Sequence, residues 1–348
     1  MKILIATTHV PFIRGGAEAH AEELRKALLK AGHEAEIIGI PFKWYPPEKI
    51  LDHMLACRLF DLTEAGGVSI DMLIGLKFPA YLIPHPNKVL WILHQHRTAY
   101  DLWDHPLNDL LTYPNGAQIR SAIQHADQHF IPQAKTVFAN SKNVAKRLKT
   151  FCKIDSTPLY HPPPHAERFY CAPATDYFLF PSRIDTIKRQ SLILEALALT
   201  EHPVRIRFTG LAANAVYMRD LLSFVRKHNL QERVEWLGEV DEDEKIRLFA
   251  HSLGIVYPPV DEDYGYVTLE AMLAAKPVIT CSDSGGTLEF VIPQETGLVA
   301  SPTPAALATA LDHLWINRDQ ARLFGEAGRA RYEMLDITWP NVVRNLLS

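Results

Sequence analysis

Residues 254–272 have the sequence GIVYPPVDEDYGYVTLEAM, in which a short apolar run leads through an acidic loop into a second apolar run. The run Gly254–Tyr257 has the length of a buried strand, and the run that Tyr266 or Val267 opens is typical of a helix. A strand followed by a loop and a helix is the repeating unit of a parallel α/β sheet. The stretch therefore predicts an α/β fold with an acidic loop at the carboxyl end of a strand.

Two carboxylates of this stretch stand eight residues apart, Glu262 in the loop and Glu270 about one turn into the helix. A carboxylate accepts hydrogen bonds from two hydroxyl groups at once, so each of them can hold a diol of a ribose or hexose. Gly265 allows close backbone approach, and the free N–H groups of a helix start favour a diphosphate. The layout suits a sugar nucleotide, although acidic residues there can also simply complement the helix dipole.

Length and composition describe an ordinary globular protein. The chain has 348 residues, enough for two domains, with 47% hydrophobic and 22% charged residues. A net charge of −4 argues against a nucleic-acid partner. No apolar run is long enough to span a membrane, and the first residues predict a buried strand rather than a signal peptide. The scattered cysteines are typical of reduced thiols in a cytoplasmic protein: Cys57, Cys152, Cys171 and Cys281.

Short apolar runs alternate with helical patterns along the whole chain. The first series of expected elements is Ile3–Ala6, Ala17–Ala31, Glu34–Ile40, Met72–Ile74, Val89–Leu93 and Thr136–Ala139. A proline-rich connector follows at residues 160–165. The second series is Tyr177–Phe180, Arg189–Leu199, Arg205–Phe208, Tyr217–His228, Val234–Leu237, Gly254–Tyr257 and Val278–Thr280. This rhythm predicts two doubly wound parallel sheets joined by the connector.

Ligands of such sheets bind at the carboxyl ends of the strands, and the unusual residues of the chain follow predicted strands. Arg183 and Lys188 come after Tyr177–Phe180 and just before a helix. Two cations at a helix start are well placed to hold a diphosphate and to stabilise it as it leaves. A solvated loop is the alternative interpretation, because basic residues usually occupy such loops.

Two segments of the first half also follow predicted strands. In the loop Thr8–Glu18, Gly15 and Gly16 can admit a phosphate to bare backbone amides, although a tight turn explains them as well. His94 ends a strand and is followed by a polar and aromatic set that suits a sugar-binding wall: His96, Arg97, Tyr100 and Trp103. A structural histidine remains the alternative there.

Metal sites are not favoured. Asp241–Asp243 and Asp261–Asp263 resemble acidic D-x-D clusters that hold a divalent ion, but the first is expected to cap a helix and the second overlaps the glutamate pair. His125 and His129 have the i, i+4 spacing of zinc ligands, but a place on a helix surface is favoured. Phosphate-binding P-loops, kinase motifs and hydrolase nucleophile elbows are absent from the sequence.

Taken together, these residues resemble glycosyltransferase family 4, the retaining transferases of the two-domain GT-B fold. The stretches that carry the resemblance are Gly15–Glu18, His94–Arg97, Tyr100–Trp103, Ala139–Ser141, Arg183 with Lys188, Leu237–Gly238, Glu262 with Glu270, Ser284–Gly286 with Glu289, and Thr296–Leu298. Their order spans nearly the whole chain. Ser182 and Tyr264 depart from the family's usual glycine and phenylalanine, but neither change removes a charged group.

The resemblance implies a nucleotide-diphosphate-sugar donor, no cofactor and no divalent metal. Arg183 and Lys188 would contact the diphosphate, Glu262 the transferred sugar and Glu270 the ribose, while His94 and the pair Gly15 and Gly16 would close over the donor. Further donor-binding positions would be Tyr264, Gly265, Tyr266 and Val267; the acceptor would meet His96, Arg97, Tyr100 and Trp103. We expect residues 1–168 to form the acceptor-side domain, 169–328 the donor domain facing it across a cleft, and 329–348 a helix crossing back.

The expected activity is transfer of a sugar, with retention of configuration, to a glycan, lipid or small-molecule acceptor in the cytoplasm. A sugar-nucleotide epimerase of similar architecture and a non-catalytic nucleotide-sugar-binding subunit are the alternatives. The residues Phe42–Tyr45 and Ile50–Leu62 mix aromatics, cations and leucines, which predicts either an interfacial helix at the inner face of the membrane or a helix packed on the core.

Overall fold

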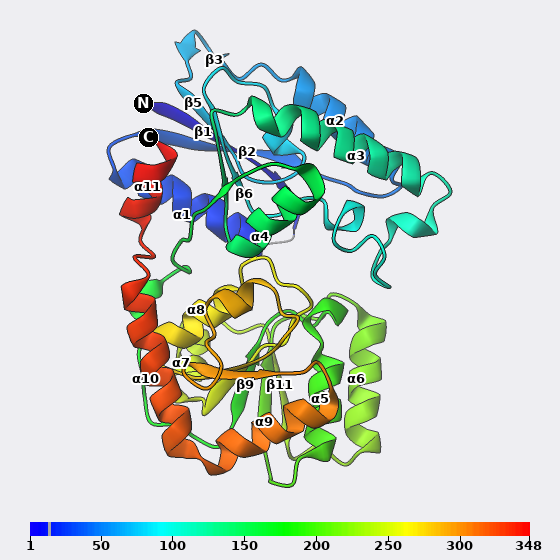
Figure 1. Cartoon of the computed structure of the whole chain (residues 1–348), viewed down its shortest axis with the longest axis vertical. Helices are drawn as coiled ribbons and strands as arrows, with labels where there is room; N and C mark the ends of the chain where they lie inside the picture. Colours follow the sequence, from blue (N-terminus) through cyan, green and yellow to red (C-terminus); the bar gives the residue numbers. More distant parts are fainter. Residues whose placement is uncertain (13–14) are drawn as a thin grey trace. The chain divides into compact units, whose positions relative to one another are not determined.

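The structure is a computed structural model that describes residues 1–12 and 15–348. The chain forms two compact units (Figure 1). Unit 1 contains Met1–Pro164 and Thr338–Ser348, and unit 2 contains His165–Ile337. The chain passes between the units at 164/165, where the sequence led us to expect 168/169, and it returns to unit 1 at Thr338 rather than at residue 329.

Unit 1 is built on a six-stranded parallel sheet. Its strands follow the order β2 (Glu34–Pro41), β1 (Lys2–His9), β5 (Met72–Gly75), β6 (Lys88–Ile92), β7 (Thr136–Ala139) and β8 (Thr157–Pro158). The five strands predicted in this half are confirmed, and β8 was not predicted. A small antiparallel hairpin of β3 (Glu64–Ala65) and β4 (Val68–Ser69) was also not predicted.

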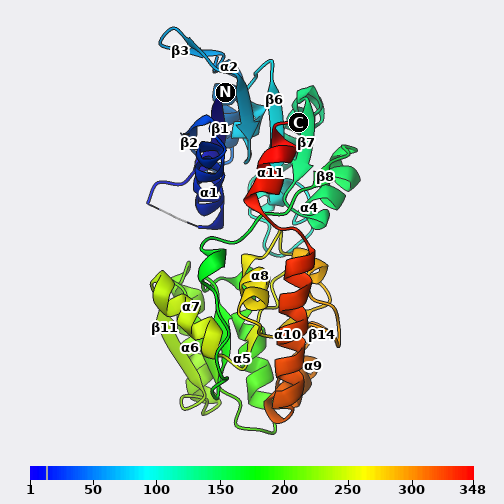
Figure 2. The ribbon, with the colours of Figure 1, turned by 90° about the vertical axis from the view of Figure 1, so that its left-hand side faces the viewer.

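Helices cover both faces of this sheet because alternate strand residues point to opposite sides. Leu4 and Ala6 pack with a core formed by α2 (Glu48–Leu59), α3 (Gly116–Phe130) and α4 (Lys142–Arg147). Ile3 and Ile5 pack on the other face with α1 (Gly16–Lys30) and α11 (Trp339–Leu346). Figure 2 shows α11, at the red end of the chain, beside the strands of unit 1. The last helix of the chain therefore completes the core of unit 1.

Short helical turns carry the connections on the α2–α3 side. They are η1 (Ala80–Leu82), η2 (Arg97–Ala99), η3 (Leu110–Thr112), η4 (Ile131–Gln133) and the π-helical turn η5 (Leu148–Cys152). The turn η6 (Ala166–Arg168) follows the connector.

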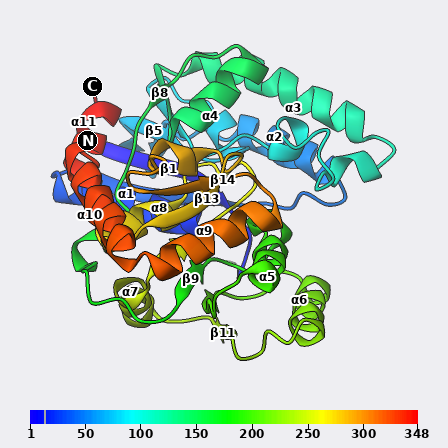
Figure 3. The same ribbon diagram turned by 60° about the horizontal axis from the view of Figure 1, so that its bottom comes forward.

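Unit 2 repeats the same architecture (Figure 3). Its parallel strands follow the order β11 (Val234–Gly238), β10 (Ile206–Thr209), β9 (Phe178–Pro181), β12 (Gly254–Val256), β13 (Val278–Cys281) and β14 (Gly297–Ala300). Residues of α5 (Gln190–Leu199), α6 (Ala215–Lys227) and α9 (Pro304–Ile316) fill one core cluster. Residues of α7 (Glu242–His251) and α8 (Tyr266–Leu273) fill another. The helix α10 (Arg318–Met334) contacts α8 and α9.

Two doubly wound parallel sheets confirm the predicted fold class, and the predicted cleft between them stays a prediction. The strand order of unit 2 reverses between β9 and β12, because β10 and β11 extend the sheet on one side and β12 starts the other. In doubly wound sheets ligands bind at the carboxyl side of this reversal. The loops after β9 and β12 are therefore the first place in unit 2 to search for a site.

Candidate active site

The loops after β9 and β12 lie together and carry the predicted charged residues. The amide of Val260, in the second loop, donates a hydrogen bond of 2.8 Å to the carbonyl of Ile187 in the first loop. Asp185 caps the turn η7 (Thr186–Lys188) by accepting from the amide of Ile187. The backbone of these two loops therefore fixes the position from which the Lys188 side chain extends.

Lys188, Tyr257 and Glu262 form one cluster at this edge. The Lys188 ammonium lies 3.0 Å from the Tyr257 hydroxyl and forms an ion pair with Glu262. The Tyr257 hydroxyl donates a hydrogen bond of 2.7 Å to the same oxygen, Oε2 of Glu262. The Lys188 and Glu262 side chains are each 16% exposed, so the cluster is mostly buried but keeps some access to solvent. The structure brings together two predicted residues and adds Tyr257.

The charges of this cluster depend on one another. Burial raises the pKa of Glu262, but the Lys188 charge and the hydrogen bonds from Lys188 and Tyr257 outweigh it, so the net pKa is lowered. Burial and then the Glu262 carboxylate raise the pKa of Tyr257 well above its usual value, with a smaller contribution from Glu270. The tyrosine is a neutral hydrogen-bond donor held next to a carboxylate and a cation.

Two glycines shape the acidic loop. Gly265 precedes α8 with φ of +81°, a left-handed conformation that glycine adopts without steric cost. Gly286 donates its amide to the carbonyl of Glu262 at 2.7 Å, and a Cβ atom there would lie 2.5 Å from the carbonyl oxygen of Asp263. Backbone contacts from Ser284–Gly286 thus hold the acidic loop in place.

Glu270 occupies a second charged cluster on α8. Its carboxylate is buried and accepts from the Lys245 ammonium at 2.9 Å, and Lys245 also pairs with Glu242 at 2.8 Å. Burial opposes the charge on Lys245, but Glu270 and Glu242 raise its pKa overall. Asp241, just before Glu242, caps α7 through a 2.8 Å hydrogen bond from the amide of Glu244, which confirms the predicted N-cap.

The remaining predicted donor-binding residues of unit 2 differ in accessibility. Arg183 is exposed, and its guanidinium forms no ion pair with any residue that the structure describes. Tyr266 is half-buried, whereas Tyr264 and Val267 are buried. The ring of Tyr264 packs edge to face on Tyr266 and on Phe290. Tyr264 and Val267 can therefore contribute backbone groups more readily than side chains.

The predicted glycine pair of unit 1 begins α1. Gly15 is the N-cap and Gly16 the first helical residue. The Gly15 amide already donates to the Glu18 carboxylate at 2.9 Å, so it is engaged rather than bare. Residues 13–14 of the same loop lie outside the described residues.

His94 and His96 follow β6 and differ in their surroundings. His94 is half-buried, and its Nδ1 lies 2.8 Å from the carbonyl oxygen of Gln95. The ring of His96 packs edge to face on Phe78 and lies 3.2 Å from the Thr98 hydroxyl through Nδ1. Burial lowers the pKa of His96 to about 4, so this imidazole is neutral at physiological pH.

The other predicted acceptor-side residues are mostly engaged within unit 1. Arg97 pairs with Asp101 at 2.7 Å, and Trp103 lies under the guanidinium of Arg120 at 4.2 Å. Tyr100 is only 2% exposed, and its hydroxyl donates to Asp127 at 2.7 Å. The expectation that Tyr100 lines a sugar-binding wall needs correction, because a buried ring does not contact an acceptor directly.

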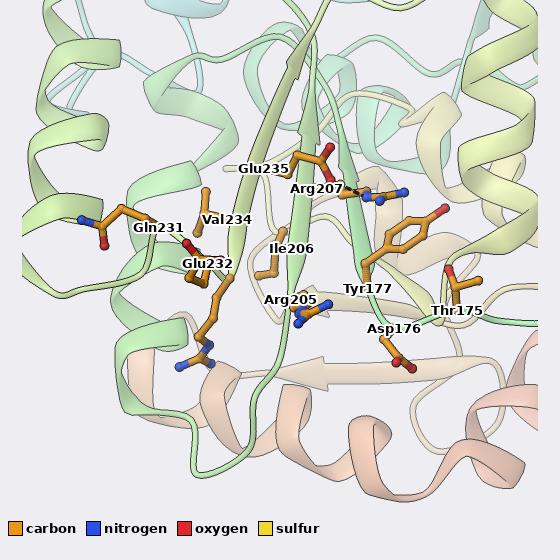
Figure 4. A pocket seen from close by; sticks show the side chains of 11 residues that line it. Thr175, Asp176, Tyr177, Arg205, Ile206, Arg207, Gln231, Glu232, Val234 and Glu235 are labelled. Carbon is orange, nitrogen blue, oxygen red and sulfur yellow. Dashed lines mark ion pairs between the residues drawn. The ribbon is translucent and has the colours of Figure 1, made fainter.

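A hollow of about 430 Å³ lies at the opposite, amino ends of β9, β10 and β11 (Figure 4). The Arg207 guanidinium lies over the Tyr177 ring and pairs with Glu235 at 2.6 Å. Arg233 is committed to the carbonyls of Val204 and His202. Arg207 and Arg233 are therefore already engaged, and the hollow is away from the carboxyl-edge clusters.

Sequence reasoning missed Tyr257 and Lys245. Tyr257 closes an apolar strand and is indistinguishable from a core residue in the sequence. Lys245 lies among the acids of Asp241–Glu244, where helix-surface pairing is the usual expectation. The position of Tyr257 directly after a strand is the one signal that could have found it.

Residues 172–331 match the glycosyl transferases group 1 family. The D-rhamnosyltransferase WbpZ of Pseudomonas aeruginosa is 33% identical over 162 residues, 46% of this chain and 41% of that protein. The alpha-1,3/1,6-mannosyltransferase ALG2 of Dictyostelium discoideum is 31% identical over 123 residues, 35% and 29% of the two chains. These alignments span less than half of either relative. The O-antigen chain mannosyltransferase C of Escherichia coli is 22% identical, covering 96% of this chain and 94% of its own.

Solved structures match the whole chain in fold. Sucrose-phosphate synthase from Thermosynechococcus elongatus has a TM-score of 0.79 at 19% identity, covering 100% of this chain and 98% of that one. Anabaena HepE, solved in complex with UDP-glucose, has a TM-score of 0.71 at 17% identity, with the same coverage. The two-domain GT-B fold expected from the sequence is therefore confirmed.

Proposed function

We propose that the chain is a glycosyltransferase of group 1, whose family model matches residues 172–331, and that within this group it is a retaining transferase of family 4. It moves a sugar from a nucleotide-diphosphate-sugar to a glycan, lipid or small-molecule acceptor. The observation that carries this proposal is the Lys188–Tyr257–Glu262 cluster at the strand-order reversal of unit 2. The epimerase and the non-catalytic subunit are not favoured, because the curated relatives named above are transferases.

The cluster suggests how a donor is engaged. In our proposal the diphosphate takes the Lys188 ammonium away from Glu262, and Arg183 supplies a second positive charge. The released Glu262 carboxylate then accepts hydroxyl protons of the transferred sugar, while Glu270 holds the ribose. As the sugar–phosphate bond breaks, charge develops on the leaving diphosphate, where a placed cation is most effective. These cations supply the charge that a metal ion would otherwise supply, so no divalent metal is required.

Retention is proposed to follow from attack of the acceptor on the same face that the diphosphate leaves. The departing phosphate oxygen takes the acceptor proton, so neither Glu262 nor His94 has to act as the base. His94, Gly15 and Gly16 are further proposed to contact the donor. This part of the proposal rests on the family alone.

Donor binding and turnover test the proposal. The wild-type protein is incubated with GDP-mannose, UDP-glucose and dTDP-rhamnose, with octyl α-D-mannopyranoside as acceptor, and released nucleotide diphosphate is measured. A matching donor at 100 times its Kd should stabilise the fold by about 2.7 kcal/mol. Lys188→Ala should reduce turnover by roughly 10²–10³, the loss expected for one charge-stabilising donor.

Lys227→Ala is the matched control, because Lys227 is an exposed lysine of unit 2 outside the cluster. It should leave turnover unchanged. Absence of binding and turnover with a broad nucleotide-sugar panel would count against the proposed function. Equal turnover in wild type and Lys188→Ala would refute the role of Lys188.

We further propose that the protein works in the cytoplasm and contacts the inner face of the membrane through α2. No helix in the described part of the chain is long and apolar enough to cross a bilayer. Leu55 and Leu59 of α2 are 61% and 75% exposed, and Phe60 follows them at 40%. A hollow of about 280 Å³ with mainly apolar walls lies between α2 and α3, with Arg58 at its edge. An apolar face with a cation beside it favours interfacial binding to anionic lipid.

Co-sedimentation with phosphatidylglycerol vesicles tests this contact. The double variant Leu55→Glu/Leu59→Glu should lose binding. Leu323→Glu, at a leucine 54% exposed on α10, should retain it. Failure of the wild-type protein to sediment with the vesicles would refute the membrane contact while leaving the proposed transfer reaction standing.

A further inference from the structure

Asp127 is a carboxylate buried in unit 1 without a cation. The residue is 0% exposed on α3, and no ion pair to it is found among residues 1–12 and 15–348. Its Oδ1 accepts from the Tyr81 hydroxyl at 2.8 Å, and its Oδ2 accepts from the Tyr100 hydroxyl at 2.7 Å. Burying an ionisable carboxyl costs free energy that an apolar residue would avoid. A role beyond packing would explain its presence at this position.

The same helix holds the segment from His94 to Trp103 at three points. Arg120 and Gln124 both donate to the carbonyl of Ala99, at 3.0 Å and 3.2 Å. The hydroxyl of the next residue, Tyr100, donates its hydrogen bond to Asp127. Positions 120, 124 and 127 are spaced i, i+4 and i+7, so they share one face of α3. The Arg120 guanidinium also lies over Trp103.

We propose that Asp127 is a positioning residue for the acceptor-side segment 94–103, which it holds in place by fixing the Tyr100 hydroxyl. It touches no substrate itself. The segment carries His94 and His96 at its start and Trp103 at its end, so a shift of Tyr100 moves residues proposed to meet donor and acceptor. The positioning role itself does not depend on the proposed function. Only the predicted effect on kinetics rests on it.

The ionised carboxylate is required because each of its oxygens receives one hydroxyl proton. A protonated carboxyl, or an amide, presents a hydrogen-bond donor at one of its two positions, and the tyrosine facing that position must then turn away or accept instead of donate. Loss of ionisation would therefore break or rearrange the hydrogen bond to Tyr100 or Tyr81 without removing any side chain.

The surroundings of Asp127 bring its change of ionisation close to neutral pH. Burial raises the pKa of Asp127 to about 7, against the hydrogen bonds from Tyr100 and Tyr81, which lower it. The titratable groups facing it are Tyr81, Tyr100 and Cys152 of η5, and burial raises the pKa of each, to about 11 for the Cys152 thiol. These neighbours stay neutral between pH 6 and 8. The Lys88 ammonium lies 3.4 Å from the Tyr81 carbonyl oxygen, and burial lowers its pKa to about 8, so the Asp127→Asn variant is needed to assign a change in this range to Asp127.

Hydrogen exchange of the full-length protein tests the positioning directly. The amides of Leu102 and Trp103 donate to the carbonyls of Arg97 and Tyr100 at 3.0 Å and 3.1 Å and report on the segment. Asp127→Asn and Tyr100→Phe should speed their exchange by about tenfold, the effect of losing roughly 1.4 kcal/mol of local stability. Tyr81→Phe, the matched control, removes the other hydrogen bond to Asp127 and should leave these amides unchanged.

The pH dependence supplies a second readout. After correction for intrinsic exchange rates, wild-type exchange in the segment should quicken as pH falls from 8 to 6, and Asp127→Asn should show no such change. If Asp127→Asn fails to fold, Tyr100→Phe against Tyr81→Phe still decides the matter. Unchanged exchange in Tyr100→Phe, or equal acceleration in Tyr100→Phe and Tyr81→Phe, would overturn the assignment.

A kinetic measurement separates this inference from the proposed function. With octyl α-D-mannopyranoside and a turned-over donor, Tyr100→Phe should raise the acceptor KM by about tenfold, and Tyr81→Phe should leave the acceptor KM unchanged. An acceptor KM in Tyr100→Phe equal to that of the wild type would overturn the inference. If the wild-type protein turns over no donor, the proposed function fails, while the exchange result still tests the positioning role.

Discussion

The Tyr257 hydroxyl donates a 2.7 Å hydrogen bond to the Glu262 carboxylate, and this bond ties the end of strand β12 to the loop that follows it. The bond holds one oxygen of the carboxylate at the same point where Lys188 approaches. The free protein therefore keeps the acidic group aligned before any ligand arrives. Such preorganisation reduces the ordering needed when a charged ligand binds.

Removing this hydroxyl tests its contribution. Tyr257→Phe keeps the ring and leaves Glu262 with the Lys188 pair alone. A hydrogen bond to a charged group contributes about 1.5–3 kcal/mol, so we expect kcat/KM for the donor to fall by roughly 10- to 100-fold. Steady-state kinetics with the donor found in the panel measure the change. Tyr177→Phe, which removes a hydroxyl bonded to the Leu248 carbonyl at the other end of the sheet, should leave kcat/KM unchanged. Equal losses in both variants would point to a general effect on the fold.

Lys245 is expected to support Glu270 rather than to bind ligand alone. Lys245→Met preserves the hydrocarbon stem but leaves the buried Glu270 carboxylate without its cation, at a cost of about 1–3 kcal/mol in unfolding free energy. Urea unfolding measures this cost. Adding Glu270→Gln to Lys245→Met should recover part of it, because the unpaired charge is then gone. A double variant as unstable as the sum of the two single variants would show that the two side chains do not interact.

The fold and the charged half of the site could be read from the sequence. Buried parallel strands are continuous apolar runs, so β9 and β12 stand out, and Lys188 and Glu262 lie in the segments that follow them. The short edge strand β8, with two residues, offers no such run. Composition and spacing therefore locate the edge of the sheet at which ligands of such folds bind.

The partners inside the site could not be read in this way. Tyr100 is in a polar aromatic segment that suggested an exposed wall, but its hydroxyl is satisfied by Asp127, 27 residues further along the chain. Lys245 reaches Glu270 across 25 residues. Hydrogen bonds between distant segments depend on how helices dock on the sheet, which local sequence patterns do not specify.

The lowered pKa of Glu262 predicts how the stability of the protein depends on pH. Burial raises this pKa, but the Lys188 charge and the two hydrogen bonds lower it below the usual value of 4.5. A carboxyl whose pKa is lowered by folding stabilises the protein above its unfolded-state pKa, and this contribution is lost as pH falls through the folded-state pKa. The difference in unfolding free energy between wild type and Glu262→Gln should therefore be largest near pH 7 and shrink below about pH 4. Urea midpoints from pH 7 to pH 3 measure it, and a difference that grows toward acid pH would contradict the lowered pKa.

The backbone of Gly286 lies close to the backbone of the acidic loop. A Cβ atom on Gly286 would lie 2.5 Å from the Asp263 carbonyl oxygen and 3.1 Å from that of Glu262, both of them backbone atoms. Gly286→Ala must push this loop outward, which we expect to cost about 1–3 kcal/mol of unfolding free energy and to weaken donor binding as Glu262 moves from Lys188. Gly328→Ala, within α10, is the matched control: a Cβ atom there would lie 3.6 Å from its nearest neighbour, Cγ of Met272 on α8, so alanine should stabilise α10 by roughly 0.5–1 kcal/mol. Urea unfolding and donor titration of both variants provide the comparison. Donor affinity in Gly286→Ala equal to that of the wild type would show that the position of Glu262 does not depend on this contact.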